Sequence, residues 1–320
     1  MISLKQLRYF DAVAKAGHFG KAAERCAITQ PALSMQIQDL EQVLGTPLLE
    51  RSAKGVILTD TGREIAVRAA QILSGVRDLT DLARRQSKGF AGPLRLGVIP
   101  TIAPYLLPPL LPQFRERYPE VDLHLRETQT QHLLAELNDG KLDLLLLALP
   151  IDCPNIETIR LFDDRFVLAT APDRPLGRQV RATIKMLQQD RLLLLEEGHC
   201  LRDQVLEFCD LRPTGNLDTS GASSLSTLVQ IVINGLGITL LPELSLKVES
   251  RQGPIKLLRF AEPEPMRTIG LAWRQSSPRK QDFVELGNLM TDVAATHRRS
   301  TAQGEEQTEH PDRPQMIVPQ

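Results

Sequence analysis

Apolar residues recur every three or four positions along the start of the chain, the spacing of helices with one buried face. The pattern predicts three helices in turn, over residues 4–16, 21–25 and 30–44. Thr29 is a natural N-cap for the third helix, Pro31 fits its first turn, and Gly45 ends it. Two short helices, a tight turn and an amphipathic third helix form a helix-turn-helix. The basic segment 46–57 that follows is predicted to be a two-stranded wing.

The next apolar residues are spaced alternately by four and three positions, as along the seam of a coiled coil. They are Ile65, Ala69, Ile72, Val76, Leu79 and Ala83. Such a seam suits the pairing of two helices better than burial against a globular core. We therefore expect a long helix over residues 63–84 that pairs with a second copy of the chain, followed by a hinge over residues 86–93.

Beyond the hinge, short apolar strands alternate with helices, a pattern typical of a parallel α/β sheet. Strands are predicted at residues 94–98, 121–126, 142–149 and 267–273, with helices over 101–118, over 133–138 and from Arg279. A second run of this kind covers residues 165–259. A chain that leaves one α/β lobe and returns to it forms two lobes around a cleft. Residues 300–320 are poor in apolar side chains, and we expect them to be disordered.

Composition and charge narrow the function classes. With 320 residues, 42% of them hydrophobic and 24% charged, the chain is long enough for two or three globular domains. No export signal opens the sequence, and the longest apolar run is too short for a bilayer, so we expect a cytoplasmic protein without a membrane partner. Residues 1–89 carry 13 Lys and Arg against 9 Asp and Glu, whereas the rest carries 25 against 30. The basic N-terminal part is therefore a candidate for contact with a polyanion.

The third helix leaves a polar face free for such a contact. Its members are Gln30, Ser34, Gln36 and Gln38. Gln and Ser can pair with base edges and phosphates in a major groove, and Arg51 and Lys54 on the wing can reach a phosphate or the minor groove. Taken alone, this face could equally be a solvated surface. A two-fold dimer would present two such helices to half-sites about 34–36 Å apart.

These residues form a recognisable set of motifs. They include Ala22-Ala23, Thr29-Gln30-Pro31-Ala32-Leu33-Ser34, Leu48-Leu49-Glu50-Arg51 and Leu58-Thr59 with Thr61-Gly62. The set resembles the N-terminal domain of the LysR-type transcriptional regulators. The resemblance implies that double-stranded promoter DNA is the partner, that Thr29 and Pro31 belong to the binding surface, and that the two lobes form a periplasmic-binding-protein-like sensor.

The predicted architecture combines α and α/β parts: a winged helix-turn-helix, a long linker helix and a two-lobed α/β sensor domain. The expected boundaries are 1–61 for the DNA-binding domain, 62–91 for the linker helix and hinge, 92–298 for the sensor and 299–320 for a disordered tail. Within the sensor, lobe I comprises residues 92–164 and 267–298, and lobe II comprises residues 165–266.

Two of the four cysteines lie in a promising setting. Cys200 is flanked by His199 and, two residues on, by Arg202, and Cys209 follows nine residues after Cys200. A thiol beside an imidazole and a guanidinium is placed where its thiolate is stabilised. A metal site is not expected, because no Cys-x-x-Cys pair or fourth ligand accompanies these residues. No cofactor is expected either.

The stretch 195–204, together with Phe208-Cys209, resembles the OxyR-type hydrogen-peroxide sensors within the LysR group. Similar stretches are 97–101, 104–108, 127–130 and 267–271. The resemblance implies that Cys200 reacts with peroxide and that Cys209 resolves the product. It also implies a peroxide pocket whose candidates are Thr101, Thr130, His199 and Arg267, with Arg202 and Asp203 as further polar support.

The spacing of the two thiols suggests a switch. If residues 201–208 are helical, Cys200 and Cys209 lie about 13–14 Å apart along the axis and on opposite faces. A disulfide needs Cα atoms within about 7 Å. Oxidation to a sulfenic acid, followed by attack of the second thiol, would therefore have to remodel the segment.

Three functions remain open from the residues. The first is a peroxide-sensing regulator, not an enzyme. The second is a LysR-type regulator that binds a small organic effector in the cleft between the lobes, and the third is a thiol peroxidase-like enzyme fused to a DNA module. The resemblance to the peroxide sensors further implies control of peroxide-detoxification genes, by activation or repression, and contacts with RNA polymerase and a reductant of the glutaredoxin or thioredoxin type. The helix seam, together with an interface between sensor domains, leads us to expect a dimer of dimers.

Overall fold

Three helices and a wing build the N-terminal domain of the computed structural model, which describes residues 1–52, 55–88, 90–175, 181–208 and 217–308. The elements are α1 (Leu4–Ala16), α2 (Phe19–Cys26), α3 (Gln30–Leu44), β1 (Leu49–Ser52) and β2 (Gly55–Leu58). Thr29 caps α3 by accepting a hydrogen bond from the backbone N–H of Ala32, and Gly45 ends the helix in a left-handed conformation. The leucines of α3 pack with Phe10 and Val13 of α1 in one small core. The helix-turn-helix and its antiparallel wing are thus present as predicted.

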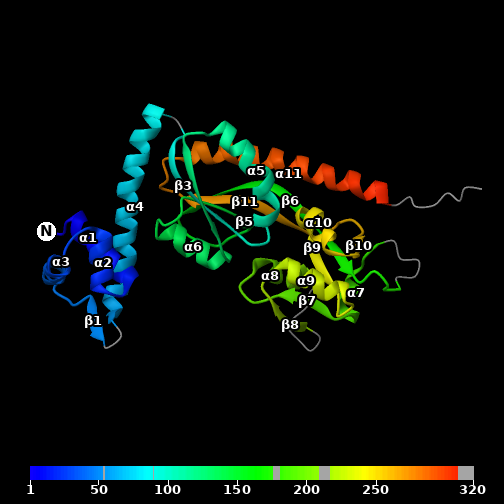
Figure 1. Ribbon diagram of the computed structural model, residues 1–320, viewed down its shortest axis with the longest axis horizontal. Helices are drawn as coiled ribbons and strands as arrows, with labels where there is room; N and C mark the ends of the chain where they lie inside the picture. Colours follow the sequence, from blue (N-terminus) through cyan, green and yellow to red (C-terminus); the bar gives the residue numbers. More distant parts are fainter. Residues whose placement is uncertain (53–54, 89, 176–180, 209–216, 309–320) are drawn as a thin grey trace, which may run out of the picture.

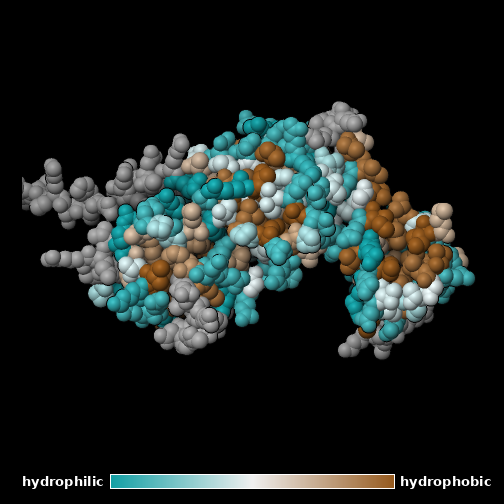
Figure 2. Space-filling view, turned by 180° about the vertical axis from the view of Figure 1, so that it is seen from behind, coloured by the Kyte–Doolittle hydropathy of each residue, from teal (hydrophilic) through white to brown (hydrophobic). Residues whose placement is uncertain are grey.

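A single long helix, α4 (Asp60–Lys88), joins this domain to the rest of the molecule (Figure 1). Its first turns pack against the N-terminal core, so Ala69 is buried and Ile65 is half-buried within the same chain. The predicted pairing seam therefore does not hold at Ile65 and Ala69, because the start of α4 is also the last helix of the DNA-binding domain. Ile72, Val76 and Leu79 remain exposed, and apolar side chains gather along α4 in Figure 2.

The first lobe of the sensor domain contains a mixed sheet. Its elements are β3 (Gly92–Val98), α5 (Ala103–Arg117), β4 (Val121–Glu127), α6 (Thr130–Asn138), β5 (Leu144–Leu149), β11 (Met266–Arg274) and α11 (Lys280–Thr308). The strands β4, β3 and β5 are parallel as predicted, whereas β11 pairs antiparallel with β5 because the chain re-enters from the second lobe. Helix α11 runs on to Thr308, although disorder was expected from Ser300. The expectation missed residues 300–308 because Ala, Gln and Glu extend an existing helix without needing apolar burial.

One long strand, β6 (Ile156–Thr170), leads from the first lobe into the second. The first part of β6 pairs with β11, and its last residues pair with β9 and β10. The other elements are α7 (Ile184–Gln189), β7 (Leu192–Leu195), α8 (Cys200–Phe208), β8 (Leu217–Ala222), α9 (Leu225–Ile233), β9 (Thr239–Pro242), α10 (Leu246–Glu249) and β10 (Lys256–Arg259). Strands β6 and β11 thus join the lobes, and α8 faces α6 across the gap (Figure 1). None of the described helices is long and apolar enough to cross a membrane.

Candidate functional site

Cys200 is the first residue of α8, at the boundary between the lobes. The preceding loop is fastened to the first lobe, because the side chain of Gln129 donates a hydrogen bond to the Glu197 carbonyl at 3.2 Å. Gly198 has a φ of +91°, and a Cβ at this position would lie 2.5 Å from Oε1 of Gln129. The left-handed φ favours glycine here, and any larger residue would also have to push the Gln129 amide aside. His199 itself is buried, with Nε2 3.7 Å from the Glu196 carboxylate.

A narrow cavity of about 170 Å³ opens beside Cys200. Its lining includes Ile99, Pro100, Thr101, Gln129, Thr130, Gly198, His199 and Cys200. The hydroxyl of Thr130 is buried and has no hydrogen-bond partner among the described residues. A buried hydroxyl without a partner is unfavourable unless a water or small ligand satisfies it. The space is too tight to admit even a water-sized molecule without a small shift of its lining, so it could open only to a very small ligand.

Arg267 approaches this cavity through Thr101. Its Nη1 donates to Thr101 Oγ1 at 2.8 Å, and its Nη2 donates to the Thr101 carbonyl at 3.0 Å. The same guanidinium forms a forked ion pair with Asp164, at 3.0 Å from Nε and 2.9 Å from Nη2 to Oδ2. Both side chains are fully buried. Burial raises the pKa of Asp164, and Arg267 and the backbone N–H of Leu244 act against that rise.

The other two pocket candidates lie differently. Arg202 is buried, but its Nη1 points back to the Leu195 carbonyl at 3.3 Å, where it supports β7. Asp203 is exposed and lines a wider interlobe cleft of about 1210 Å³, which Cys200 also borders. The fold thus brings Thr101, Thr130 and His199 together at Cys200, with Arg267 behind Thr101, and keeps Arg202 and Asp203 outside the narrow cavity.

Helix α8 bears on the predicted thiol switch. It is helical from Cys200 to Phe208, as the prediction required, while Cys209 lies outside the described residues. Eight helical steps separate Cys200 from Phe208, which corresponds to about 12 Å along the axis. The two ends of α8 are therefore far apart in this state.

Asp164 is a site residue that the sequence analysis missed. It lies in β6, directly opposite Arg267 on β11 in the antiparallel register. The available signal was an acidic residue within a strand that becomes almost wholly buried from that point on. A carboxylate there needs a cationic partner, and the sequence shows several arginines without showing which one is opposite.

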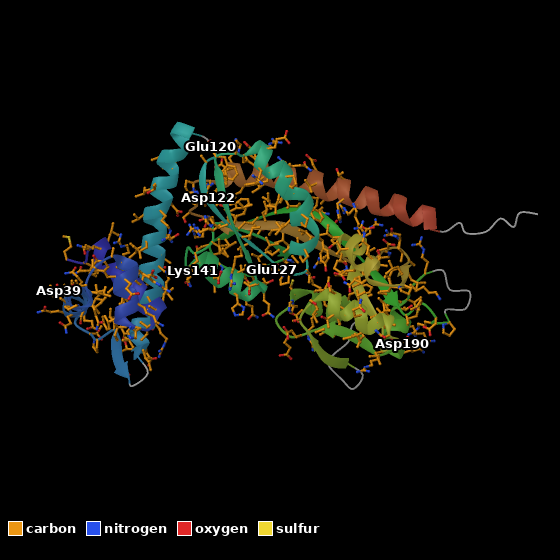
Figure 3. The ribbon with its side chains drawn as sticks, viewed as in Figure 1. Asp39, Glu120, Asp122, Glu127, Lys141 and Asp190 are labelled. Atoms are coloured by element: carbon orange, nitrogen blue, oxygen red, sulfur yellow. The ribbon has the colours of Figure 1, made fainter. Side chains whose placement is uncertain are left out.

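The predicted DNA surface lies on the outer side of α3. Gln30, Pro31 and Gln38 are exposed and Ser34 is partly exposed. Gln36 is half-buried and donates to Asp39 at 3.4 Å, and Asp39 projects from α3 on the side away from α4 (Figure 3). Arg51 lies in β1, although its side chain is not described, and Lys54 lies outside the described residues.

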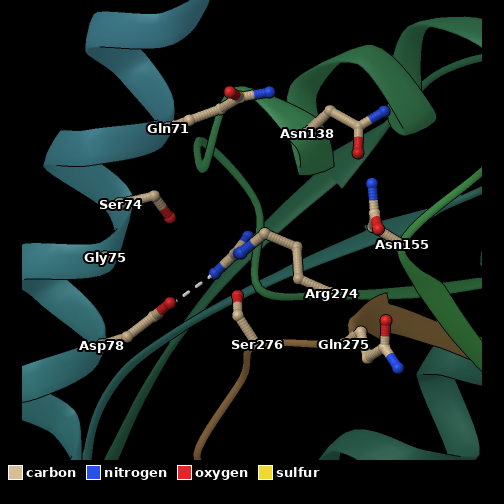
Figure 4. Close-up of a pocket in the computed structure, with 9 residues that line it drawn as sticks. All are labelled: Gln71, Ser74, Gly75, Asp78, Asn138, Asn155, Arg274, Gln275 and Ser276. Atoms are coloured by element: carbon tan, nitrogen blue, oxygen red, sulfur yellow. Dashed lines mark hydrogen bonds and ion pairs between the residues drawn. The ribbon is translucent and has the colours of Figure 1, made fainter.

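A second polar cavity, of about 1060 Å³, lies where α4 meets the first lobe (Figure 4). Arg274, at the end of β11, reaches across it to Asp78 on α4 at 3.4 Å and donates to the Leu142 carbonyl at 2.6 Å. Nearby, Arg77 donates to the Gly140 carbonyl at 2.9 Å. Burial, together with Arg95 and Arg274, lowers the pKa of Arg77. These contacts join the linker helix to the sensor.

Two family models together cover most of the chain. Residues 4–63 match the bacterial regulatory helix-turn-helix of the lysR family, and residues 87–294 match the LysR substrate-binding domain. A relative from Streptomyces viridosporus, named a probable hydrogen peroxide-inducible genes activator, is 46% identical over 91% of this chain and 94% of its own. The Escherichia coli K12 protein named DNA-binding transcriptional dual regulator OxyR is 39% identical over 90% and 95%.

Solved structures show the same likeness. A full-length OxyR variant from Pseudomonas aeruginosa aligns with a TM-score of 0.76 and 37% identity, over 92% of this chain and 95% of that one. A Corynebacterium glutamicum OxyR variant with hydrogen peroxide bound aligns with a TM-score of 0.65 and 36% identity, over 95% and 97%. Both the sequence and the structural likeness therefore extend from the DNA-binding domain through the sensor.

Proposed function

The chain belongs to the LysR family of bacterial regulators, within its OxyR-like group, and we propose that it senses hydrogen peroxide through Cys200 and responds by changing transcription at its promoter DNA. The observation that carries this proposal is the narrow cavity at Cys200, where Thr130 offers a buried hydroxyl without a partner. A site this tight could open to a molecule as small as peroxide, whereas the wider cleft outside it would suit an organic effector.

The first step is oxidation of Cys200. Its thiolate attacks one oxygen of the peroxide, the S–O bond forms as the O–O bond breaks, and the second oxygen leaves as hydroxide, which takes a proton to become water. The product is a sulfenic acid. Hydroxyl donors placed at the leaving oxygen lower the barrier, because negative charge develops there in the transition state. Thr101 and Thr130 are the donors that this chain supplies.

The second step joins the two thiols. The thiolate of Cys209 attacks the Cys200 sulfur, the S–S bond forms as the S–O bond breaks, and the hydroxide that leaves takes a proton to become water. Because α8 holds Phe208 about 12 Å from Cys200 along its axis, the helix must unwind before the residue that follows Phe208 comes within disulfide range. The reaction therefore changes the shape of the second lobe beside the cleft.

This chemistry makes the protein a stoichiometric sensor and not a turnover enzyme. A cytoplasmic thiol reductant of the glutaredoxin or thioredoxin type would restore the dithiol, with Cys200 leaving the disulfide as a thiol. The exposed apolar residues of α4, from Ile72 to Ala83, are the proposed contact with a second copy, and a second interface between sensor domains would give a dimer of dimers. RNA polymerase is the proposed partner at activated promoters.

Mass spectrometry and DNA binding on the same samples test the proposal. We expect one equivalent of hydrogen peroxide to convert the full-length protein to a species with a Cys200–Cys209 crosslink and an altered footprint on promoter DNA. Cys200→Ser should abolish both changes. Cys153→Ser is the matched control, because Cys153 is also a partly buried free thiol, and it should leave both intact.

Two results would contradict the proposal. A Cys200→Ser protein whose footprint still responds to peroxide would exclude Cys200 as the sensor, and a response to an organic effector instead would favour the wider cleft as the input site. Continuous consumption of peroxide with added reductant, at the rate of a thiol peroxidase, would favour an enzyme.

A further inference from the structure

We propose that Asp164 is a positioning residue for the peroxide step, acting through Arg267 to fix the direction in which the Thr101 hydroxyl donates. This inference rests on the proposed function of Cys200. Asp164 touches neither the cavity nor Cys200 in the described contacts. Its carboxylate instead holds the guanidinium whose other end binds Thr101.

The hydrogen bonds have only one possible direction. A guanidinium donates and never accepts, so Thr101 Oγ1 must accept the bond from Arg267 Nη1. The Thr101 hydroxyl then keeps its own proton for another acceptor, and the cavity beside Cys200 is where Thr101 also lies. An isolated threonine hydroxyl can rotate and either donate or accept. Arg267 thus converts Thr101 into a committed donor toward the peroxide.

Asp164 keeps Arg267 in place for this task. Its Oδ2 accepts from Nε and Nη2 of the guanidinium, and its Oδ1 accepts from the backbone N–H of Leu244 at 2.9 Å. The carboxylate is therefore held from two sides, by the second lobe and by β11. Two bonds to one oxygen of Asp164 hold one edge of the guanidinium, and the bonds to Thr101 hold the other, so both its position and its plane are fixed.

Asp164→Asn tests the inference, with two reactions of Cys200 measured on the full-length protein. Oxidation by hydrogen peroxide needs the donors of the cavity, whereas alkylation by neutral iodoacetamide needs only an accessible thiolate. We expect Asp164→Asn to slow peroxide oxidation by at least about tenfold and to change the alkylation rate by less than about twofold. A general disturbance of the fold would instead move both rates.

The neighbouring acid provides a matched control. Asp163 accepts from Thr268 at 2.9 Å and pairs with Arg160 on a more exposed side of β6. Asp163→Asn should leave both rates as in the wild type. Thr101→Val should slow peroxide oxidation by itself, and adding Asp164→Asn to it should produce little further loss, since both act through one hydroxyl. Additive losses would overturn the inference.

Arg267→Lys is a second variant in case Asp164→Asn does not fold. Lysine can keep a charge opposite Asp164 but cannot span Asp164 and Thr101 with a rigid fork, so it should also slow only the peroxide reaction. Unchanged peroxide kinetics in these variants would refute the positioning role alone. A wild-type Cys200 that does not react with peroxide would refute the proposed function itself.

Met35 supports an independent inference, because it places an apolar side chain on the outward face of α3. Successive residues of a helix turn by 100°, which puts Pro31, Met35, Gln38 and Gln42 opposite the buried Leu33, Ile37 and Leu40. All four are exposed, and Met35 is 57% exposed. We infer that Met35 contacts the C5 methyl group of a thymine in the major groove, where that methyl is the apolar feature of the base edges.

Removal of single methyl groups tests this contact. The probe is a duplex that the wild-type protein selects from a random-sequence pool, with each thymine replaced in turn by deoxyuridine. We expect one position per half-site at which the loss of the methyl weakens wild-type binding about threefold to fourfold and does not affect Met35→Ala. Gln42→Ala, on the same face, should keep the wild-type sensitivity. The absence of any such position would overturn the inference.

Discussion

Two arginines on strand β11 form ion pairs of opposite character. Arg267, near its start, pairs with Asp164 in complete burial between the lobes. Arg274, at its end, pairs with Asp78 of the linker helix beside a polar cavity (Figure 4). It also lies 3.8 Å from Asp143. One strand thus carries the proposed peroxide pocket near one end and the joint with the linker helix at the other.

The difference lies in what each pair tolerates. A fully buried pair cannot lose one partner without leaving an uncompensated charge in the interior. The Arg274–Asp78 pair is only partly buried and borders an open cavity, so it can exchange a partner for water or for another charge at a lower cost. If the proposed function holds, we therefore expect the Arg267 end of β11 to stay fixed while peroxide reacts and the Arg274 end to shift when the second lobe changes shape.

Loss of Arg267 should have the largest effect. Arg267→Met leaves Asp164 buried without its cation, and we expect the free energy of unfolding to fall by about 3–5 kcal/mol, measured by urea denaturation followed by circular dichroism. Asp78→Asn should lower it by about 1 kcal/mol, because Arg274 keeps its hydrogen bonds to the Leu137 and Leu142 carbonyls. Combining Arg267→Met with Asp164→Leu should recover part of the loss. Equal losses in the Arg267 and Asp78 variants would remove the contrast between the two ends.

Asp78→Asn should change how strongly the oxidation state of the sensor affects DNA affinity, with little effect on stability. If the Arg274–Asp78 contact carries the signal to the DNA-binding half, its loss should reduce the ratio of DNA affinities between oxidised and reduced protein by about twofold to tenfold. Fluorescence anisotropy with labelled promoter DNA measures this ratio, and stopped-flow oxidation of Cys200 should be unchanged. Glu64→Gln, which removes a charge from the same helix away from the Arg274–Asp78 contact, should keep the full ratio. An unaltered ratio in Asp78→Asn would mean that the signal takes another route.

The sequence predicted the N-terminal domain almost completely, because its signals are local. Thr29 caps α3, Gly45 ends it, and the leucine spacing marks its buried face. The cluster of Thr101, Thr130 and His199 at Cys200 also matches the residues that the family resemblance implied. Their roles in the chemistry remain predictions.

The two arginine pairs could not be predicted in this way. Arg267 lies 103 residues from Asp164, and Arg274 lies 196 residues from Asp78. The first pair depends on the register of β6 against β11, and the second on how α4 packs against the first lobe. Neither relation leaves a periodic pattern in the chain. The same limit explains why the heptad pattern of α4 misplaced Ala69, which fits the heptad but is buried by the N-terminal core.

Tyr105 is another buried polar side chain of the sensor domain, and the smallest effect is expected there. Tyr105 on α5 donates to Glu249 of α10 at 2.6 Å, and burial, followed by the Glu249 contact, raises the pKa of Tyr105 above its ordinary value of 10.0. The fold therefore favours the neutral phenol. This contribution is complete below pH 10 and declines as the pH rises further, because only the unfolded chain can then release the proton readily.

Tyr105→Phe should lower the free energy of unfolding by about 1 kcal/mol at pH 8, since Ser226 still donates to Glu249. Between pH 9 and pH 11, the difference between wild type and Tyr105→Phe should shrink, because the wild type alone loses the stability tied to this phenol. Chemical denaturation at each pH gives both curves, and groups such as Tyr118 titrate equally in the two proteins. Parallel curves would mean that water reaches the Tyr105 hydroxyl and that the Tyr105–Glu249 contact is as open to solvent as the partly buried Arg274–Asp78 pair.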